Sequence, residues 1–275
     1  MTQAVLDRRR EHAVPRSLGS AELTTKRSGV VSAIDKLRSA GATKLLFPSR
    51  RGPVEAIVVN TAGGLTGGDT YRLASHAGAA SHLILTTQAA ERAYRSAAGQ
   101  AQVETTISAG PGARLHWLPQ EMIIFDGAAL HRSLSVDLAA GAEAVLVEPL
   151  VFGRTAMGEV LHDGTLDDQI TVARDGVPIY RDRIRLGDAL GASLARPSVA
   201  GGMAALATVI CAGPRAEALL DLVRQLLPAT GSASLLARDF MVLRLLAGDG
   251  YLLRRTLVPV LETLTGAALP KSWSL

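Results

Sequence analysis

Apolar and polar residues alternate over much of this 275-residue chain. A period of two is typical of β-strands with one buried and one exposed face. The predicted strands cover residues 21–28, 30–34, 54–60, 102–107, 133–138, 168–173, 178–186 and 204–212, with two short strands within 234–247. Pro53 cannot donate a hydrogen bond to a ladder, so the strand at 54–60 should begin after it. Residues 37–48 have the character of a linker.

Three related segments begin at Gly78, Gly112 and Gly141, with spacings of 34 and 29 residues. Each opens with Gly-Ala, continues as an apolar strand and ends at polar residues. A repeat of about 30 residues that is built from strands indicates stacked strand pairs, as in a β-solenoid or a large sandwich. We therefore expect a mainly β domain, β-helix-like, with stacked sheets.

Two amphipathic segments in the last quarter of the chain, residues 215–227 and 251–265, predict α-helices. Apolar residues recur in both at spacings of three and four, the stripe that a helix buries on one face. The second stripe consists of Leu253, Leu257, Val260, Leu261 and Leu264. Pro259 lies inside this segment and should kink or split the helix. The fold class is thus mainly β with two α-helices in the C-terminal half.

A glycine loop separates the strand at 54–60 from Asp69, with glycines at positions 63, 64, 67 and 68. Glycine adopts positive φ without a Cβ clash and allows close approach of another backbone. The two Gly-Gly pairs therefore indicate a sharp bend or a close contact, and the simplest interpretation is a hairpin turn with a bulge. The spacing fits neither a P-loop, which needs a following Lys, nor a dinucleotide-binding fingerprint.

The amino-acid composition limits the classes of protein to which this chain can belong. Apolar residues make up 48% of the chain, which predicts a packed globular domain. No apolar run approaches about 18 residues, so we expect no membrane span. The single cysteine, Cys211, cannot form an internal disulfide, and this fits a reducing, cytoplasmic location.

Charge is unevenly distributed. Residues 1–55 carry eleven Lys and Arg against five Asp and Glu, whereas the rest carries 18 against 20. A basic N-terminal segment can contact nucleic acid or an acidic surface, but the chain has no nucleic-acid-binding signature, so we interpret it as a solvated arm. We assign residues 1–19 to a flexible basic segment and residues 20–275 to one domain.

His82 and His116 occupy the same place in their repeats, four residues after the glycine. If the repeats stack, the two imidazoles lie near each other on one face, and imidazole is a ligand for nickel, copper or zinc. The third repeat has Val145 at this place. The alternative is two surface histidines facing water.

A second dense stretch, residues 148–159, places Glu148 and Glu159 around an apolar segment together with Arg154. Carboxylate oxygens can ligate a metal, and a guanidinium can bind a carboxylate through two hydrogen bonds. From the chemistry alone, a structural salt bridge is the simpler interpretation.

Four motifs in this order resemble the UreD family of urease accessory proteins, called UreH in some bacteria. They are Asn-Thr-Ala-Gly-Gly-Leu-Thr-Gly-Gly-Asp at 60–69, Thr-Thr-Gln-Ala-Ala-Glu-Arg-Ala-Tyr-Arg-Ser at 86–96, Trp-Leu-Pro-Gln-Glu at 117–121 and Phe-Gly-Arg-Thr-Ala-Met-Gly-Glu at 152–159. The closing Leu-Pro-Lys-Ser-Trp at 269–273 is similar as well. The resemblance spans about residues 20–273.

This resemblance implies a non-enzymatic role in the cytoplasm. Proteins of the family form a complex with UreF and UreG, dock on apo-urease, and help to deliver two nickel ions and to allow carbamylation of the active-site lysine. The fold implied is strand-rich and β-helix-like. It also implies no tightly bound cofactor, only transient contact with nickel, and no nucleic-acid or membrane partner. A homodimer within the activation complex is compatible with it.

A passage for nickel is one hypothesis that follows. An ion in transit needs weak, oxygen-rich surroundings, and Asp69, Glu148 and Glu159 lie beside glycines and apolar strands, where an isolated carboxylate is costly to bury. His82 and His116 complete the candidate metal contacts. Two alternatives stay open: a scaffold that never touches nickel, and a hydrolase that uses Asp69 and Glu148 as an acid/base pair.

Overall fold

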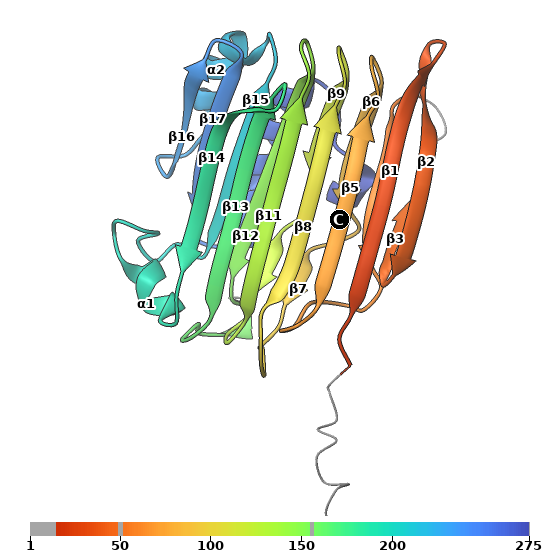
Figure 1. The fold of residues 1–275 in the computed structure, drawn as a ribbon. Helices are drawn as coiled ribbons and strands as arrows, with labels where there is room; N and C mark the ends of the chain where they lie inside the picture. Colours follow the sequence, from red (N-terminus) through yellow and green to blue (C-terminus); the bar gives the residue numbers. More distant parts are fainter. Residues whose placement is uncertain (1–14, 49–51, 155–156, 275) are drawn as a thin grey trace, which may run out of the picture.

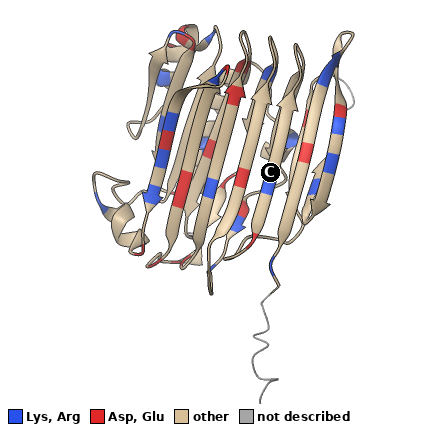
Figure 2. Ribbon diagram, in the orientation of Figure 1, with Lys and Arg blue, Asp and Glu red and all other residues tan. Residues whose placement is uncertain are grey.

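Two β-sheets face each other in the computed structural model, which describes residues 15–48, 52–154 and 157–274 (Figure 1). The seven-stranded sheet has the order β14-β13-β11-β8-β5-β1-β2. Its strands are β1 (Leu18–Ser28), β2 (Val31–Gly41), β5 (Thr70–Ala77), β8 (Ala101–Ala109), β11 (Ala129–Leu138), β13 (Thr165–Arg174) and β14 (Val177–Leu186). Its outer face carries both signs of charge (Figure 2).

The ten-stranded sheet has the order β16-β17-β15-β12-β9-β6-β4-β3, with β10 and β7 as a branch beside β12. Its strands are β3 (Thr43–Leu46), β4 (Val54–Asn60), β6 (His82–Thr87), β7 (Glu91–Ala93), β9 (Arg114–Leu118), β10 (Met122–Ile124), β12 (Glu143–Phe152), β15 (Ala205–Ala212), β16 (Gly231–Ala237) and β17 (Phe240–Ala247).

The predicted repeats account for this arrangement. In each, the Gly-Ala turn carries the chain from the seven-stranded sheet to the ten-stranded one: from β5 to β6, from β8 to β9 and from β11 to β12. Successive repeats then pair in parallel, so that Leu83 lies opposite Leu115 and Leu115 opposite Ala144. The prediction of a mainly β fold with stacked, solenoid-like strand pairs is confirmed.

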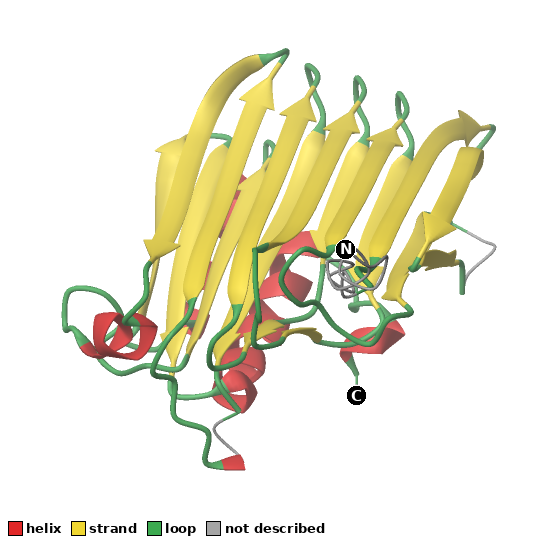
Figure 3. Cartoon of the chain, turned by 60° about the horizontal axis from the view of Figure 1, so that its bottom comes forward, coloured by secondary structure: helices red, strands yellow, loops and turns green. Residues whose placement is uncertain are grey.

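Three apolar cores hold the layers of the described chain together. One lies between the sheets and is built on aliphatic side chains such as Leu23, Leu83 and Leu115. A second lies on the far face of the ten-stranded sheet, where α2 (Ala216–Leu226) and α3 (Gly250–Thr265) pack. The third includes Leu130, Leu150 and Leu190. Figure 3 shows the strands as layers with the helices outside them. All five apolar residues predicted for the stripe of the last helix are buried.

The helices differ from prediction in two details. Pro259 does not split α3, which runs as a single helix from Gly250 to Thr265. A short helix, α1 (Leu190–Ala195), was not predicted; it has six residues and no side-chain cap, so it leaves little pattern in the sequence. A 3₁₀ turn, η4 (Lys271–Trp273), ends the described chain. None of the helices in the described ranges is long and apolar enough to cross a membrane.

The prediction of a linker over residues 37–48 is wrong, because most of this segment belongs to β2 and β3. β2 pairs with β1 through its backbone, but almost all of its side chains are exposed on both faces. A strand without a buried face needs no alternation of apolar and polar residues. The basic N-terminal segment lies largely outside the described residues, which begin at residue 15, and β1 begins at Leu18.

Candidate functional site

The glycine loop, residues 61–69, joins β4 of the ten-stranded sheet to β5 of the seven-stranded one. The predicted hairpin turn is wrong, because strands in different sheets are not neighbours in a ladder. The predicted close contact is confirmed. A Cβ atom on Gly64 would collide with the ring of Tyr94, and one on Gly67 would collide with the hydroxyl of Ser96. Residues 92–99 therefore lie in direct contact with the loop at its glycines, which have no side chains.

Asp69, the last residue of this loop, accepts backbone hydrogen bonds with both of its carboxylate oxygens. Its Oδ1 accepts a hydrogen bond of 2.7 Å from the backbone N–H of Ser17, and its Oδ2 accepts one of 2.8 Å from the N–H of Thr66. The side chain is buried. Both oxygens thus satisfy backbone donors that would otherwise lack a partner, which is a structural role.

We expect Asp69→Ala to lower the free energy of unfolding by about 1–3 kcal/mol, because two partly buried N–H groups lose their acceptors. Urea denaturation measures the change. Asp188→Ala, at an exposed position, is the matched control and should lie within about 0.5 kcal/mol of the parent. Equal stability of the two variants would contradict the role of Asp69.

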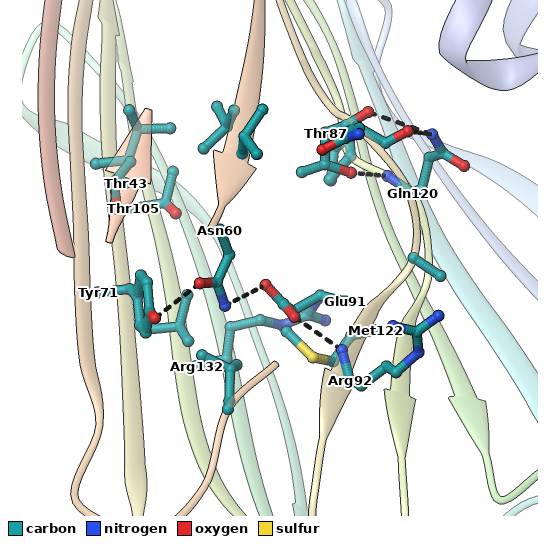
Figure 4. A pocket seen from close by; sticks show the side chains of 18 of the residues that line it. Thr43, Asn60, Tyr71, Thr87, Glu91, Arg92, Thr105, Gln120, Met122 and Arg132 are labelled. Atoms are coloured by element: carbon teal, nitrogen blue, oxygen red, sulfur yellow. Dashed lines mark hydrogen bonds between the residues drawn. The ribbon is translucent and has the colours of Figure 1, made fainter. Parts of the chain in front are cut away.

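A cavity of about 330 Å³ lies between the two sheets, next to the glycine loop (Figure 4). Both sheets contribute to its wall. Its apolar side chains include Val58, Leu73 and Met122, and its polar ones include Asn60, Tyr71 and Gln120. The described charged residues along the cavity are three glutamates and three arginines: Glu91, Glu104, Glu148, Arg72, Arg92 and Arg132. Asp69 is not among the described lining residues.

A chain of hydrogen bonds runs along one wall of the cavity. The hydroxyl of Tyr71 donates to Oδ1 of Asn60 at 2.8 Å, and Nδ2 of Asn60 donates to Oε2 of Glu91 at 3.0 Å (Figure 4). The backbone N–H of Arg92 donates to the other oxygen of Glu91 at 2.9 Å. Burial raises the pKa of Glu91, and these hydrogen bonds oppose the shift.

A buried ion cluster forms another part of the wall. Nη1 of Arg132 lies 2.7 Å from Oε2 of Glu148, and its Nε and Nη2 donate to both oxygens of Asp168 at 2.8 and 2.7 Å. Trp117 Nε1 donates to Oε1 of Glu148 at 2.7 Å. The three side chains are buried, so two carboxyl groups share one guanidinium away from water.

Strand register explains how this cluster assembles. Arg132 and Asp168 are direct partners in the parallel pair of β11 and β13, so their side chains share the inner face of the seven-stranded sheet. Glu148 reaches them from β12 in the other sheet. Burial disfavours the charged guanidinium, but Asp168 and Glu148 outweigh it and raise the pKa of Arg132. Burial raises the pKa of Glu148, and Arg132 opposes that shift.

The C-terminal turn completes the cavity wall at Gln120. Nε2 of Gln120 donates to the carbonyls of Gln88 and Ser272 at 3.0 and 2.8 Å, and Arg254 donates to its Oε1 at 2.7 Å. Trp273 is buried beside this group, and its Nε1 donates to the carbonyl of Leu118 at 3.0 Å. The motifs at 86–96, 117–121 and 269–273 thus meet at one place.

The two candidate histidines lie side by side, as stacking of the repeats predicts. The ring centroids of His82 and His116 are 4.7 Å apart. His116 is buried, so the alternative of two surface histidines is wrong for it. Burial lowers the pKa of His82 to about 4 and that of His116 to about 3, which keeps both rings neutral at pH 7.

This histidine pair borders a separate cavity of about 50 Å³, together with Glu143 and Cys211. Nε2 of His82 is buried without a hydrogen-bond partner among the described residues. Within the same ranges, no three His, Cys, Asp or Glu side chains come close enough together to hold a metal ion.

Glu159 forms the salt bridge that the sequence suggested. Its Oε2 accepts from the backbone N–H and Nε of Arg154 at 2.9 and 3.1 Å. Although burial acts in the opposite direction, hydrogen bonds from Arg154 lower the pKa of Glu159. The guanidinium of Arg154 also lies over the ring of Phe125, 4.6 Å from its centroid.

Of the five candidate metal contacts, Glu148 alone is among the described residues that line the large cavity. All four oxygens of Asp69 and Glu148, the suggested acid/base pair, contact groups of the protein itself. Sequence reasoning missed Arg132 and Asp168, although a signal was present. Arg132 lies two residues from both Leu130 and Leu134, so its charged side chain is on the apolar face of the same strand.

Comparison with known proteins agrees with the resemblance seen in the sequence. The family model described as UreD urease accessory protein matches residues 17–274. A urease accessory protein UreD of Roseobacter denitrificans is 48% identical over 262 residues, which cover 95% of this chain and 96% of that protein. Its namesake in Ruegeria pomeroyi is 45% identical over 92% of this chain and 100% of its own length. The chain belongs to the UreD family of urease accessory proteins.

Proposed function

We propose that this chain helps to deliver nickel to apo-urease as part of an activation complex with UreF and UreG, and that it is not an enzyme. Family membership supports a role in urease maturation. The proposal goes beyond family membership in four respects: nickel transfer, the partners UreF and UreG, a cytoplasmic location, and a homodimer within the activation complex. It also includes the absence of a tightly bound cofactor. In this view nickel is cargo that the protein passes on.

The large cavity is the observation that carries the nickel step. Its wall contains the carboxyl groups of Glu91 and Glu148 and the hydroxyl of Tyr71, whose oxygens contact protein groups in this structure. Oxygen ligands bind nickel more weakly than thiolates or several imidazoles do, so they suit an ion that must move on. The ion cluster around Arg132 contains two carboxyl groups against one guanidinium, and this excess of carboxyl oxygens favours entry of a cation.

Glu148→Gln tests this step without removing the fold. The glutamine keeps the size of the side chain and an oxygen that can accept from Trp117, while Arg132 keeps its two hydrogen bonds to Asp168. In cells that carry the urease operon, deletion of this gene should leave intact, nickel-poor urease without activity. The parent gene should restore activity, and the Glu148→Gln variant should restore several-fold less at equal protein abundance.

Glu262→Gln is the matched control, because Glu262 is an exposed carboxylate on α3 and does not line the cavity. It should restore activity fully. Full restoration by Glu148→Gln as well would remove the nickel passage and favour the scaffold alternative. Full urease activity without the gene would overturn the whole proposal.

A further inference from the structure

Four strands form the outer edges of the two large sheets, and three of them are protected against pairing with another chain. β3 has only four residues. β16 has α2 packed against it, and Arg224 donates to the carbonyl of Ala233 at 3.1 Å. β14 contains Pro178 and exposes three arginines at alternate positions, 181, 183 and 185. Short length, cover, proline and charge are the usual means of blocking an edge strand.

β2 is the fourth edge strand, and it lacks most of these means of protection. It has 11 residues and no proline, and no strand of the described chain pairs with its free side (Figure 1). One further backbone contact lies near its start, where the N–H of Ser32 donates to the carbonyl of Gly52 at 3.3 Å. Six of the sixteen large apolar side chains exposed in the described chain lie between residues 18 and 46, so exposed apolar surface concentrates at this edge. A long bare edge of this kind is a template for one more strand.

The side chains of β2 form two rows of different chemistry. Ile34 and Leu37 lie opposite the buried Thr25 and Leu23 of β1, so they continue the core face beyond the last covered strand, at 38% and 50% exposure. Lys36 and Arg38 belong to the opposite, outer row, in which Arg38 lies opposite Glu22 of β1. The neighbouring carboxylate Asp35 already pairs with Lys26 at 2.8 Å. Figure 2 shows the Lys and Arg positions along this strand in blue.

We propose that β2 is the docking edge for an extended segment of a protein partner in which apolar and acidic residues alternate. Such a segment adds an eighth strand to the seven-stranded sheet through its backbone. Its apolar residues then cover Ile34 and Leu37, and its carboxylates on the other face lie next to Lys36 and Arg38. This inference concerns a binding edge and does not depend on nickel passing through the cavity.

Charge argues against a second copy of this chain as the occupant. Two β2 strands side by side would bring Lys36 and Arg38 of both copies to the same seam, and like charges across a strand pair are destabilising. An acidic partner segment relieves this repulsion. The charge pattern of β2 therefore favours a partner segment with negative charge. The apolar row favours a segment in which apolar residues alternate with the acidic ones.

The test uses the full chain and a fluorescein-labelled ten-residue peptide of alternating Glu and Val. We expect the peptide to bind, by fluorescence anisotropy, and to slow hydrogen exchange at the amides of β2 and not at those of β14. The double variant Lys36→Glu/Arg38→Glu should weaken binding about tenfold, because two favourable charge pairs become repulsive. Leu37→Ser should also weaken it. Arg181→Glu/Arg185→Glu, on β14, is the matched control and should leave binding unchanged.

Three results would overturn the proposal. The first is equal binding of a peptide of alternating Lys and Val. The second is unchanged affinity of the Lys36→Glu/Arg38→Glu variant, shown to be folded by its circular dichroism. The third is self-association in sedimentation that Leu37→Ser abolishes, which would make a second copy the occupant. A peptide with five Glu followed by five Val has the same composition, and we expect it to bind more weakly because it cannot match both rows.

Discussion

Arg132→Met is expected to lower the free energy of unfolding by about 3–5 kcal/mol, the usual cost of removing one partner from a buried ion cluster. Arg132 bonds to both oxygens of Asp168 and to Glu148, and all three side chains are buried. Methionine fills a similar space but leaves two carboxylates without a positive partner. Urea denaturation at pH 7 measures the change.

The loss should depend on pH in a defined direction. Burial already raises the pKa of Glu148, and Arg132 opposes this shift, so removal of the guanidinium raises that pKa further in the folded chain. The folded variant then takes up a proton more readily than the unfolded chain does. Protonation therefore favours folding, and the deficit should be largest at pH values above the raised pKa of Glu148 and shrink as the pH falls through it.

Arg72→Met is the matched control for Arg132→Met. Arg72 also pairs with a carboxylate, Glu104, at 2.8 Å, but this pair is exposed. Its loss should cost no more than about 1 kcal/mol, because water solvates the remaining charge. The triple variant Arg132→Met/Glu148→Gln/Asp168→Asn should recover part of the lost stability. If Arg132→Met proved as mild as Arg72→Met, the buried cluster would not be the strong contact that we describe.

Trp273→Ala is expected to cost about 3–5 kcal/mol, the range for truncating a buried tryptophan. The indole is buried against the outer core of the ten-stranded sheet, and the guanidinium of Arg254 lies over it, 5.0 Å from its centroid. Truncation should also loosen the adjacent turn, whose Ser272 carbonyl accepts from Gln120 on the cavity wall. Thermal and urea denaturation measure the loss, and hydrogen exchange at residues 117–121 reports the loosening.

Trp273→Phe separates packing from hydrogen bonding at the same position. Phenylalanine keeps most of the buried area and loses the bond from Nε1 to the carbonyl of Leu118. That carbonyl still accepts from the Thr86 hydroxyl at 2.7 Å, so it is not left unsatisfied. We therefore expect a cost of about 1 kcal/mol. Equal losses for the alanine and phenylalanine variants would show that the hydrogen bond, and not the packing, holds the turn.

Local pattern was sufficient to predict the elements that bury one face. The Gly-Ala repeats predicted the turns between sheets and brought His82 and His116 together, because parallel strands of equal repeats align equal positions. The stripe in α3 predicted its buried residues because a helix repeats every 3.6 residues. β2 was predicted only over its first residues, 30–34, and its second half was taken for a linker, since an edge strand exposed on both faces has no period to detect.

The chemistry of the cavity was decided by the tertiary structure. Arg132, Glu148 and Asp168 stand on three different strands, and only the facing of the two sheets brings Glu148 to the other two. The sequence alone placed Glu148 beside Arg154, its near neighbour along the chain. It also grouped Asp69 with the metal contacts, although Asp69 bonds to two backbone amides.

The sequence by itself thus determined the family, the strand repeats and the helices, because each of these depends on residues that are close in the chain or on whole motifs in order. The tertiary structure decided which charges pair, where the cavity lies and which edge stays bare. These features depend on contacts between residues far apart in the chain. Burial makes unpaired charges costly, so the partner that the fold supplies, and not the neighbour in sequence, sets the role of each carboxylate.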